Sequence, residues 1–397
     1  MIKSDHIHYK WFILALGTAT YFFTIGLGRP CIPVLFKEIL DDLGFSIFEI
    51  GTIWGMDSFA GALVALPTGL LIDRFSVRRV LTLVCLSIGI LGAARGLSTG
   101  FWTMSLAMFL FGLFAPMTTT LIPKVIAVWF DKRSLGLANS ISIMGITIGA
   151  MISASLSATM MSPLLGGWRN VLFLYGAFPI IIGLMWYIFI QDSTHPTTGQ
   201  TMKVVPFRDA FLRVIKIRQV WLLGFILFGH MGAYGGFIGY LPVYLRELGW
   251  SPIHADGALT LFLGLITLAS IPMALISDRL GSRKKILVPS LGLSCLTLGL
   301  VPFFDGLTLW LIIICHGLAR GGLMALLRAL VIETKGIGPA HAGTATGLTN
   351  ILLMLGYAFF PPLGNSLARI HLGLPFILWA SLSGLALISF IYVKEEG

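Results

Sequence analysis

Long apolar stretches recur along the whole chain and constrain its fold more than any other feature of the sequence. Each holds about 20 residues, enough for an α-helix to cross the roughly 30 Å hydrocarbon layer of a membrane. A bilayer admits only helices or closed barrels, and these stretches are too long and too uniform for barrel strands. Only 11% of the 397 residues are charged and 56% are hydrophobic, whereas a soluble domain carries about 25% charged residues. The sequence therefore predicts an all-α membrane protein.

Twelve transmembrane helices are expected, six on each side of a polar stretch near the middle of the chain. The predicted spans are 11–36, 47–73, 79–98, 101–126, 134–160, 169–191, 219–246, 255–278, 285–304, 307–333, 341–366 and 373–393. This pattern predicts an N-terminal six-helix half over 1–191, a cytoplasmic linker over 192–218 and a C-terminal six-helix half over 219–397.

A short polar turn between two apolar stretches occurs once in each predicted half. GLLIDRFSVRRVL occupies Gly69–Leu81, and ALISDRLGSRKKIL occupies Ala274–Leu287, offset by 205 residues. Other pairs keep nearly the same step, among them PVLFKE with PVYLRE, and Gly112 with Gly317. Two related six-helix halves in parallel repeat are typical of transporters that work by alternating access around a central site.

Lysine and arginine residues gather in alternate loops between the predicted spans. With the N-terminus inside, the cytoplasmic segments hold 20 of them and the outer segments hold five. Cytoplasmic loops carry this excess in membrane proteins, so both termini are predicted to be cytoplasmic. The same asymmetry explains the formal net charge of +10, and no nucleic-acid partner is expected.

Both turns resemble the signature that follows the second helix of Major Facilitator Superfamily transporters, and the resemblance covers nearly the whole chain. Ser76 stands where the signature usually has Gly, and Ala274 replaces the leading Gly of the second copy. The resemblance implies the major facilitator fold, with two pseudo-symmetric six-helix halves. It also implies that the charged residues of the two turns gate the motion, namely Asp73, Arg74, Arg78, Asp278, Arg279 and Arg283.

Short segments also resemble particular groups of transporters. GRP in the first span, GAARG in the third and LIPKVI in the fourth are similar to cyanate and nitroimidazole-type porters. AVWFDKRSLGLAN, before the fifth span, is similar to monocarboxylate and organic-anion porters. The fifth span lacks the Gly-Pro pair of drug–proton antiporters. The resemblance therefore implies a small anion or a small polar molecule as substrate.

Two charged residues are predicted at similar depth on the first two helices. Arg29 lies 18 residues beyond Trp11, and Asp57 lies 16 residues before Asp73, which places them about 27 Å and about 24 Å along their helices. A charge at depth is expensive and usually faces a cavity. Two interpretations stay open, a pair linked to substrate or protons, or an ion pair that ties the helices together near the outer gate.

Arg320 is the sharpest candidate for a binding residue, since it is predicted near the middle of the tenth span. His316 precedes it by four residues and shares its helical face. Gly317, Gly321 and Gly322 remove side-chain bulk nearby, which would let the helix bend or a ligand approach. We expect Arg320 to bind an anionic substrate, with His316 as a proton-linked partner. The alternative is a guanidinium that hydrogen-bonds backbone carbonyls.

Uncharged polar residues complete the candidate cavity. Tyr21 and His230 occupy related positions of the repeat, at a step of 209. The other candidates for substrate contact are Tyr234, Asn350 and Tyr357, with Trp54, Thr118, Thr119 and Asn139 as further polar residues. A lone polar side chain in such a helix more often bonds a neighbouring helix, which is the alternative for each of them.

No motif of a catalytic, nucleotide-binding or metal site is present. The chain has no HExxH, no CxxC and no phosphate-binding loop, so neither enzyme activity nor a cofactor nor a metal is expected. The four cysteines lie in apolar stretches and are predicted to be small core residues. The energy for transport must then come from a solute or ion gradient.

The sequence as a whole predicts a secondary transporter that moves a small anionic solute by proton symport. The protein is expected to be a monomer in the plasma membrane of a bacterium, that is, in the inner membrane. A proton-driven efflux antiporter for drug-like amphiphiles is the main rival, because many Phe and Met residues would suit such substrates. A sensor built on the same fold is a third possibility. A long signalling extension would be expected of it, and the short tail VKEEG argues against that.

Overall fold

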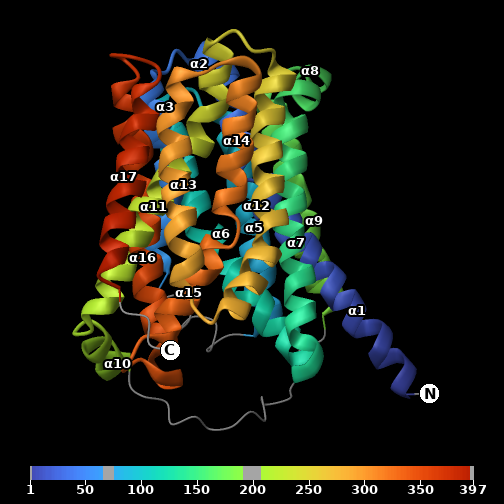
Figure 1. Cartoon of the computed structure of the whole chain (residues 1–397). Helices are drawn as coiled ribbons and strands as arrows, with labels where there is room; N and C mark the ends of the chain where they lie inside the picture. Colours follow the sequence, from blue (N-terminus) through green and yellow to red (C-terminus); the bar gives the residue numbers. More distant parts are fainter. Residues whose placement is uncertain (1, 66–75, 191–206, 394–397) are drawn as a thin grey trace. The chain divides into compact units, whose positions relative to one another are not determined.

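The computed structural model describes residues 2–65, 76–190 and 207–393, and all regular secondary structure in these ranges is helical (Figure 1). Within them, twelve helical segments are long and apolar enough to cross a membrane. The prediction of a twelve-helix, all-α membrane protein is therefore confirmed.

The chain groups by its contacts into two compact units. The first comprises Met1–Phe45 and Leu63–Gly199, and the second comprises Ser46–Ala62 and Gln200–Gly397. Residues 47–62 of the second predicted span therefore group with the later helices. The division of the chain into halves at residues 191 and 218 stays a prediction.

The described part of the first unit holds five membrane-spanning segments. Its elements are α1 (Ile2–Tyr21), the π-helical turn η1 (Phe22–Leu27), α2 (Cys31–Leu43), α5 (Val77–Ala94), the 3₁₀ turn η2 (Arg95–Leu97), α6 (Phe101–Trp129), α7 (Lys132–Leu156), the π-helical turn η3 (Ser157–Met161), α8 (Ser162–Leu165) and α9 (Trp168–Phe189). Its apolar core gathers side chains from α1, α5, α6 and α9, among them Tyr21, Phe111 and Trp186.

The first and fifth predicted spans of the chain both belong to this unit, and both run further than the sequence predicts. The first continues through α2 to Leu43, where Gly44 ends the helix in the left-handed conformation at φ 68°. Lys37 and Asp41 form an ion pair of 3.3 Å one turn apart on α2, so charged residues that mark a loop in the sequence extend a helix instead. The fifth continues through α8 to Leu165.

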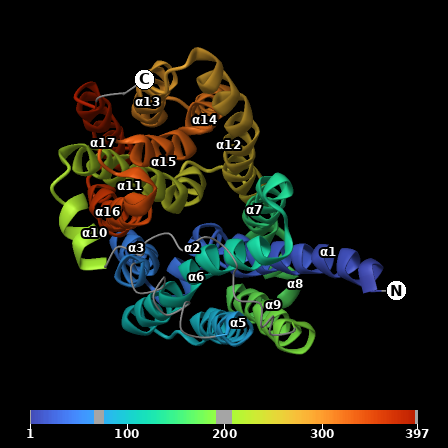
Figure 2. The same ribbon diagram turned by 90° about the horizontal axis from the view of Figure 1, so that it is seen from below.

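The second unit packs around one central helix, α11. Its elements are α3 (Ile47–Val64), α10 (Phe207–Val214), α11 (Arg218–Glu247), α12 (Pro252–Leu280), α13 (Lys284–Leu300), the 3₁₀ turn η4 (Val301–Phe303), α14 (Gly306–Arg320), α15 (Leu323–Glu333), α16 (Gly338–Leu367) and α17 (Leu374–Ile391). Figure 2 shows α16 and α17 beside α11. Glycines of α11 make this packing possible, because a Cβ on Gly232 would lie 2.1 Å from the Phe360 ring.

The tenth span is interrupted, whereas the sequence predicts one helix over 307–333. The first segment, α14, ends at Arg320, and α15 begins at Leu323. Gly322 adopts the left-handed conformation with φ 74°, which glycine tolerates because it has no Cβ. A Cβ on Gly321 would lie 2.3 Å from the Cβ of Ala269 on α12. The two glycines therefore permit both the break and the close approach of α12.

Candidate functional site

A cavity of about 270 Å³ lies at the break between α14 and α15, within the second unit. It is lined by Met231 and Tyr234 from α11, Ile266 from α12, Arg320 and Met324 at the break, and Leu353 and Tyr357 from α16. Three residues that the sequence singles out, Tyr234, Arg320 and Tyr357, thus share one cavity. The apolar members of the lining carry no individual signal in the sequence.

Arg320 is buried at this cavity, with only 5% of its surface exposed. Its guanidinium carbon lies 4.3 Å from the centre of the Tyr234 ring, a distance typical of a cation–π contact. The Tyr357 ring stands perpendicular to that of Tyr234, with the ring centres 5.8 Å apart. The Nη1 atom is buried and has no hydrogen-bond partner among the residues that the structure describes. A buried donor left without an acceptor is costly, so this atom would gain from a ligand.

The helix break adds a second electropositive group to the cavity. Gly322 caps the start of α15 without a side-chain hydrogen bond, and Met324 in the first turn lines the cavity. The first backbone N–H groups of a helix have no partner within it, and a helix N-terminus carries partial positive charge. Arg320 and the start of α15 together favour an anion.

His316 lies one turn before Arg320 but does not line the cavity. Its ring stacks on Phe262 with the ring centres 5.3 Å apart, and its Nδ1 is 2.9 Å from Thr297 Oγ1. The Thr297 hydroxyl donates to the carbonyl of Leu293 at 2.7 Å, so Nδ1–H donates to Thr297. Nε2 is therefore left as a proton acceptor, buried and without a hydrogen-bond partner in the described part of the chain. Thr297 has no motif that reveals it in the sequence.

Three other predicted contact residues lie outside the cavity lining. His230 is fully buried on α11, and neither ring nitrogen has a hydrogen-bond partner within the described ranges. Asn350 accepts a hydrogen bond of 3.4 Å from Arg328. Tyr21 is buried in the apolar core of the first unit. Their roles in substrate binding stay predictions.

Arg29 and Asp57 belong to different units of the structure. Arg29 follows η1 in the first unit, and Asp57 is 1% exposed on α3, which groups with the second unit. Their pairing therefore stays a prediction.

The second signature turn is held by charged side chains of its own unit. Arg283 donates to Asp278 at 3.1 Å and to Glu333, at the end of α15, at 2.8 Å through Nη2 and 3.0 Å through Nε. These bonds, first of all those to Glu333, raise the pKa of the Arg283 guanidinium above its usual value. Arg279 is exposed to solvent. The gating role of all three turn residues stays a prediction.

The first signature turn lies partly outside the residues that the structure describes. Asp73 and Arg74 lie outside the described residues. Arg78 is described, and its guanidinium lies 4.8 Å from the centre of the Tyr187 ring on α9. The gating roles predicted for these residues stay predictions.

Three further buried charged residues have structural partners that no sequence motif predicts. Arg246 and Asp256, at facing ends of α11 and α12, form an ion pair of 2.6 Å with 8% and 1% exposure. Arg95 is buried at the end of the third span and donates to the carbonyl of Gly28 at 2.8 Å. Arg246 and Asp256 flank one short turn, and this closeness in the sequence is the only sequence signal for their ion pair. Within the described ranges, no three His, Cys, Asp or Glu residues gather as a metal site would require.

The described ranges hold twelve membrane-spanning segments and a buried cationic cavity, which are features of a multi-pass membrane transporter. The model of the Major Facilitator Superfamily matches residues 14–361 and 245–397. The chain belongs to this superfamily, so it is a membrane transporter and not an enzyme.

Among similar proteins, the probable nitrate/nitrite antiporter NarK1 of Thermus thermophilus is 26% identical, over 91% of this chain and 86% of the relative. The nitrite extrusion protein of Bacillus subtilis is 24% identical, over 90% and 88%. The hexuronate transporter of Bacillus subtilis is 21% identical, over 75% of this chain and 73% of the relative. A bacterial homologue of the human lysosomal transporter Spinster, solved in an inward-facing and occupied conformation, aligns with a TM-score of 0.81 at 16% identity, over 98% of this chain and 99% of that chain.

Proposed function

We propose that this transporter carries a small anion across the bacterial inner membrane by proton symport, as a monomer with both termini in the cytoplasm. One observation carries the choice of an anion. Arg320 is buried at a small cavity, and its Nη1 has no hydrogen-bond partner within the described residues. A bound oxyanion would supply the missing acceptor and offset the buried positive charge.

The chemistry of the cavity suits a carboxylate, nitrate or a similar oxyanion. A guanidinium is planar and presents N–H donors in a fork that matches two oxygens of one anion. The rest of the lining is apolar apart from the two tyrosines, and a low dielectric strengthens the attraction between opposite charges. The volume of about 270 Å³ lies at or below the lower end for drug-sized ligands, which favours a small solute.

The similar proteins support the same class of substrate. The names of the three relatives above include nitrate, nitrite or hexuronate. Nitrate and nitrite are small oxyanions, and a hexuronate carries one carboxylate. An arginine that binds two oxygens bidentately would serve all of them.

His316 offers a route to proton coupling. Its Nε2 is the ring atom left to accept a proton, because Nδ1 donates to Thr297. A histidine titrates near pH 6.5 when unperturbed. A positive charge on His316 would be repelled by Arg320 one turn away, and a bound anion would relieve this repulsion. Anion binding would therefore favour proton uptake, which is the thermodynamic requirement of symport.

The position of α15 offers a link between binding and gating. Its first turn lines the cavity through Met324, and its last residue, Glu333, is held by Arg283 of the signature turn. An anion at one end and a charged turn at the other would act on the same short helix. Asp73 in the first turn is expected to act in the related way, so Asp73→Asn should slow turnover and leave affinity within a few-fold.

Uptake into proteoliposomes tests the proposal. The panel holds nitrate, nitrite, a hexuronate, small monocarboxylates and cationic amphiphiles. We expect uptake of at least one anion, and Arg320→Lys should lose most of it because a point charge cannot replace the fork. Arg213→Lys, an exposed residue of α10, is the matched control and should transport like the wild type.

The same experiment separates the proposal from its rival. Transport of cationic amphiphiles alone would favour the efflux antiporter and overturn the anion site. Wild-type anion uptake by Arg320→Lys would overturn the role of this arginine. Proton coupling is tested separately, because His316→Gln should remove the pH dependence of uptake and leave the Arg320 site intact.

A further inference from the structure

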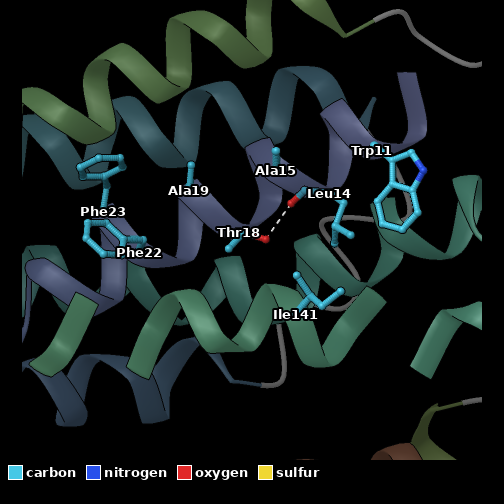
Figure 3. Close-up of a pocket in the computed structure, with 8 residues that line it drawn as sticks. All are labelled: Trp11, Leu14, Ala15, Thr18, Ala19, Phe22, Phe23 and Ile141. Atoms are coloured by element: carbon cyan, nitrogen blue, oxygen red, sulfur yellow. Dashed lines mark hydrogen bonds between the residues drawn. The ribbon is translucent and has the colours of Figure 1, made fainter. Parts of the chain in front are cut away.

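A second cavity, of about 560 Å³, follows the first membrane-spanning segment of the first unit. Seven of its lining residues come from α1 and η1, which are Trp11, Leu14, Ala15, Thr18, Ala19, Phe22 and Phe23, and Ile141 of α7 faces them (Figure 3). The cavity is a groove along one helix with Trp11 at one end and the two phenylalanines at the other. It shares no lining residue with the cavity at Arg320.

The groove offers a ligand almost no hydrogen-bonding group. The Thr18 hydroxyl donates to the carbonyl of Leu14 at 2.8 Å, as Figure 3 shows with a dashed line. Thr18 therefore satisfies its donor within its own helix. The indole N–H of Trp11 is the other polar group, and it lies at the end of the groove. A hydrocarbon chain is the ligand that such a lining fits, because burial of a polar group there would be costly.

The length of the groove matches one leaflet of a membrane. Trp11 and Phe23 are 12 residues apart, about 18 Å along a helix, and half of the hydrocarbon layer measures about 15 Å. Trp11 lies near the start of the membrane-spanning segment Tyr9–Leu43. An acyl chain that enters beside Trp11 would therefore reach Phe23 near the middle of the bilayer.

A cation stands at the Trp11 end of the groove. Lys10 Nζ lies 5.9 Å from the centre of the Trp11 ring and 5.8 Å from that of Phe130. The Tyr9 hydroxyl, next to it, donates to the carbonyl of Phe189 at 3.0 Å. Tyr and Trp are enriched at the interface between membrane and water. A lysine at that level attracts anionic lipid headgroups.

We propose that this groove is a binding site for an anionic membrane phospholipid. One acyl chain lies along α1 against Ile141, and the headgroup phosphate lies at Lys10. The apolar lining selects the chain, and the lysine selects the charge of the headgroup. This site is independent of the proposed transport function, because Arg320 lies in the other unit.

Fluorescence quenching by brominated phospholipids tests the site in the full-length protein in nanodiscs. The lipids carry the same brominated chains on either a phosphatidylglycerol or a phosphatidylcholine headgroup. The signal of Trp11 is the difference between wild type and Trp11→Phe. Its quenching should require about fivefold less of the anionic lipid than of the zwitterionic one, as one lysine near a charged membrane surface predicts.

Three variants locate the effect. Lys10→Gln should remove the preference between headgroups, and Ala15→Phe, which fills the groove, should abolish strong quenching of Trp11 by either lipid. Trp102, which is 81% exposed on α6, is the matched control, and its difference signal against Trp102→Phe should show no headgroup preference. A thermal unfolding curve checks that each variant is folded.

Several results would overturn the proposal. One is equal quenching of Trp11 by the two lipids in the wild type. Another is a preference for the anionic lipid that survives Lys10→Gln or Ala15→Phe in folded protein. A third is no quenching of Trp11 by either lipid, which would mean that something other than a lipid chain covers the groove.

Discussion

The fourth and tenth spans occupy related positions of the internal repeat, yet the chain treats them differently. The fourth span is one continuous helix, α6, over 29 residues, even though it contains Pro116 and Pro123. The tenth contains no proline and is broken at Gly321 and Gly322. A membrane helix tolerates a proline when neighbouring groups or small local adjustments satisfy the backbone carbonyl that it frees. The break follows the glycine pair, not the prolines.

The residues around the break in the tenth span also differ from their counterparts in the fourth span. At the step of 205 residues, Ala115 corresponds to Arg320 and Phe111 to His316. Val128 likewise corresponds to Glu333. The cation, the histidine and the carboxylate therefore all lie on the tenth span and have apolar counterparts on the fourth. The two repeats therefore share a scaffold, while the residues that we propose for anion binding lie on one of them.

The largest effect on stability should come from a side chain added at the break. Gly322→Ala forces an alanine into the left-handed conformation and sets a Cβ 2.9 Å from the Cβ of Met273. We expect a loss of about 2 to 4 kcal/mol in the free energy of unfolding, from backbone strain and overpacking together. Thermal unfolding of the purified protein measures it. Gly136→Ala on α7, where no atom lies within 4 Å of the new Cβ, is the matched control and should not destabilise.

A smaller effect is expected at the hydrogen bond that orients His316. Thr297→Val leaves the buried Nδ1–H without its acceptor, which costs about 1 to 3 kcal/mol, and should alter the pH dependence of uptake. Thr297→Ser keeps the hydroxyl and should behave like the wild type. Uptake measured across pH in the two variants decides this. An identical pH profile in Thr297→Val would contradict the role of the bond.

The smallest effect on stability is expected at the signature turn. Glu333→Gln weakens an exposed charged pair, so the free energy of unfolding should fall by no more than about 1 kcal/mol. Turnover should nevertheless slow, with substrate affinity within a few-fold, because Arg283 then holds α15 less firmly. Lys335→Gln, an exposed neighbour, is the control. A loss of affinity equal to the loss of turnover would argue against a role restricted to gating.

Much of the fold is readable from the sequence, because a bilayer leaves few choices. Apolar length predicts twelve spans, and the repeated turn predicts a transporter with two related repeats. The ends of the spans are harder to predict, as Lys37 and Asp41 show. They look like loop residues but pair with each other on a helix that continues to Leu43.

The candidate site is only partly readable. A charge at depth singles out Arg320, and its meeting with Tyr234 and Tyr357 is found in the structure. The position of the break cannot be deduced from Gly321 and Gly322 alone, since it depends on the approach of Ala269 from α12. Thr297 is likewise one of many threonines until the fold brings it to His316.

Protection of introduced cysteines by the transported anion tests most directly whether binding is confined to the broken span. Met324 lines the cavity, and Thr119 is its counterpart on α6. Met324→Cys and Thr119→Cys are made in a protein whose four native cysteines are replaced, and alkylation is timed with and without the anion. At an anion concentration ten times its Kd, the rate at Met324→Cys should fall about tenfold, and the rate at Thr119→Cys should not change. Adding Arg320→Lys should remove the protection. Equal protection at both positions, or protection that survives Arg320→Lys, would contradict an anion site at the break.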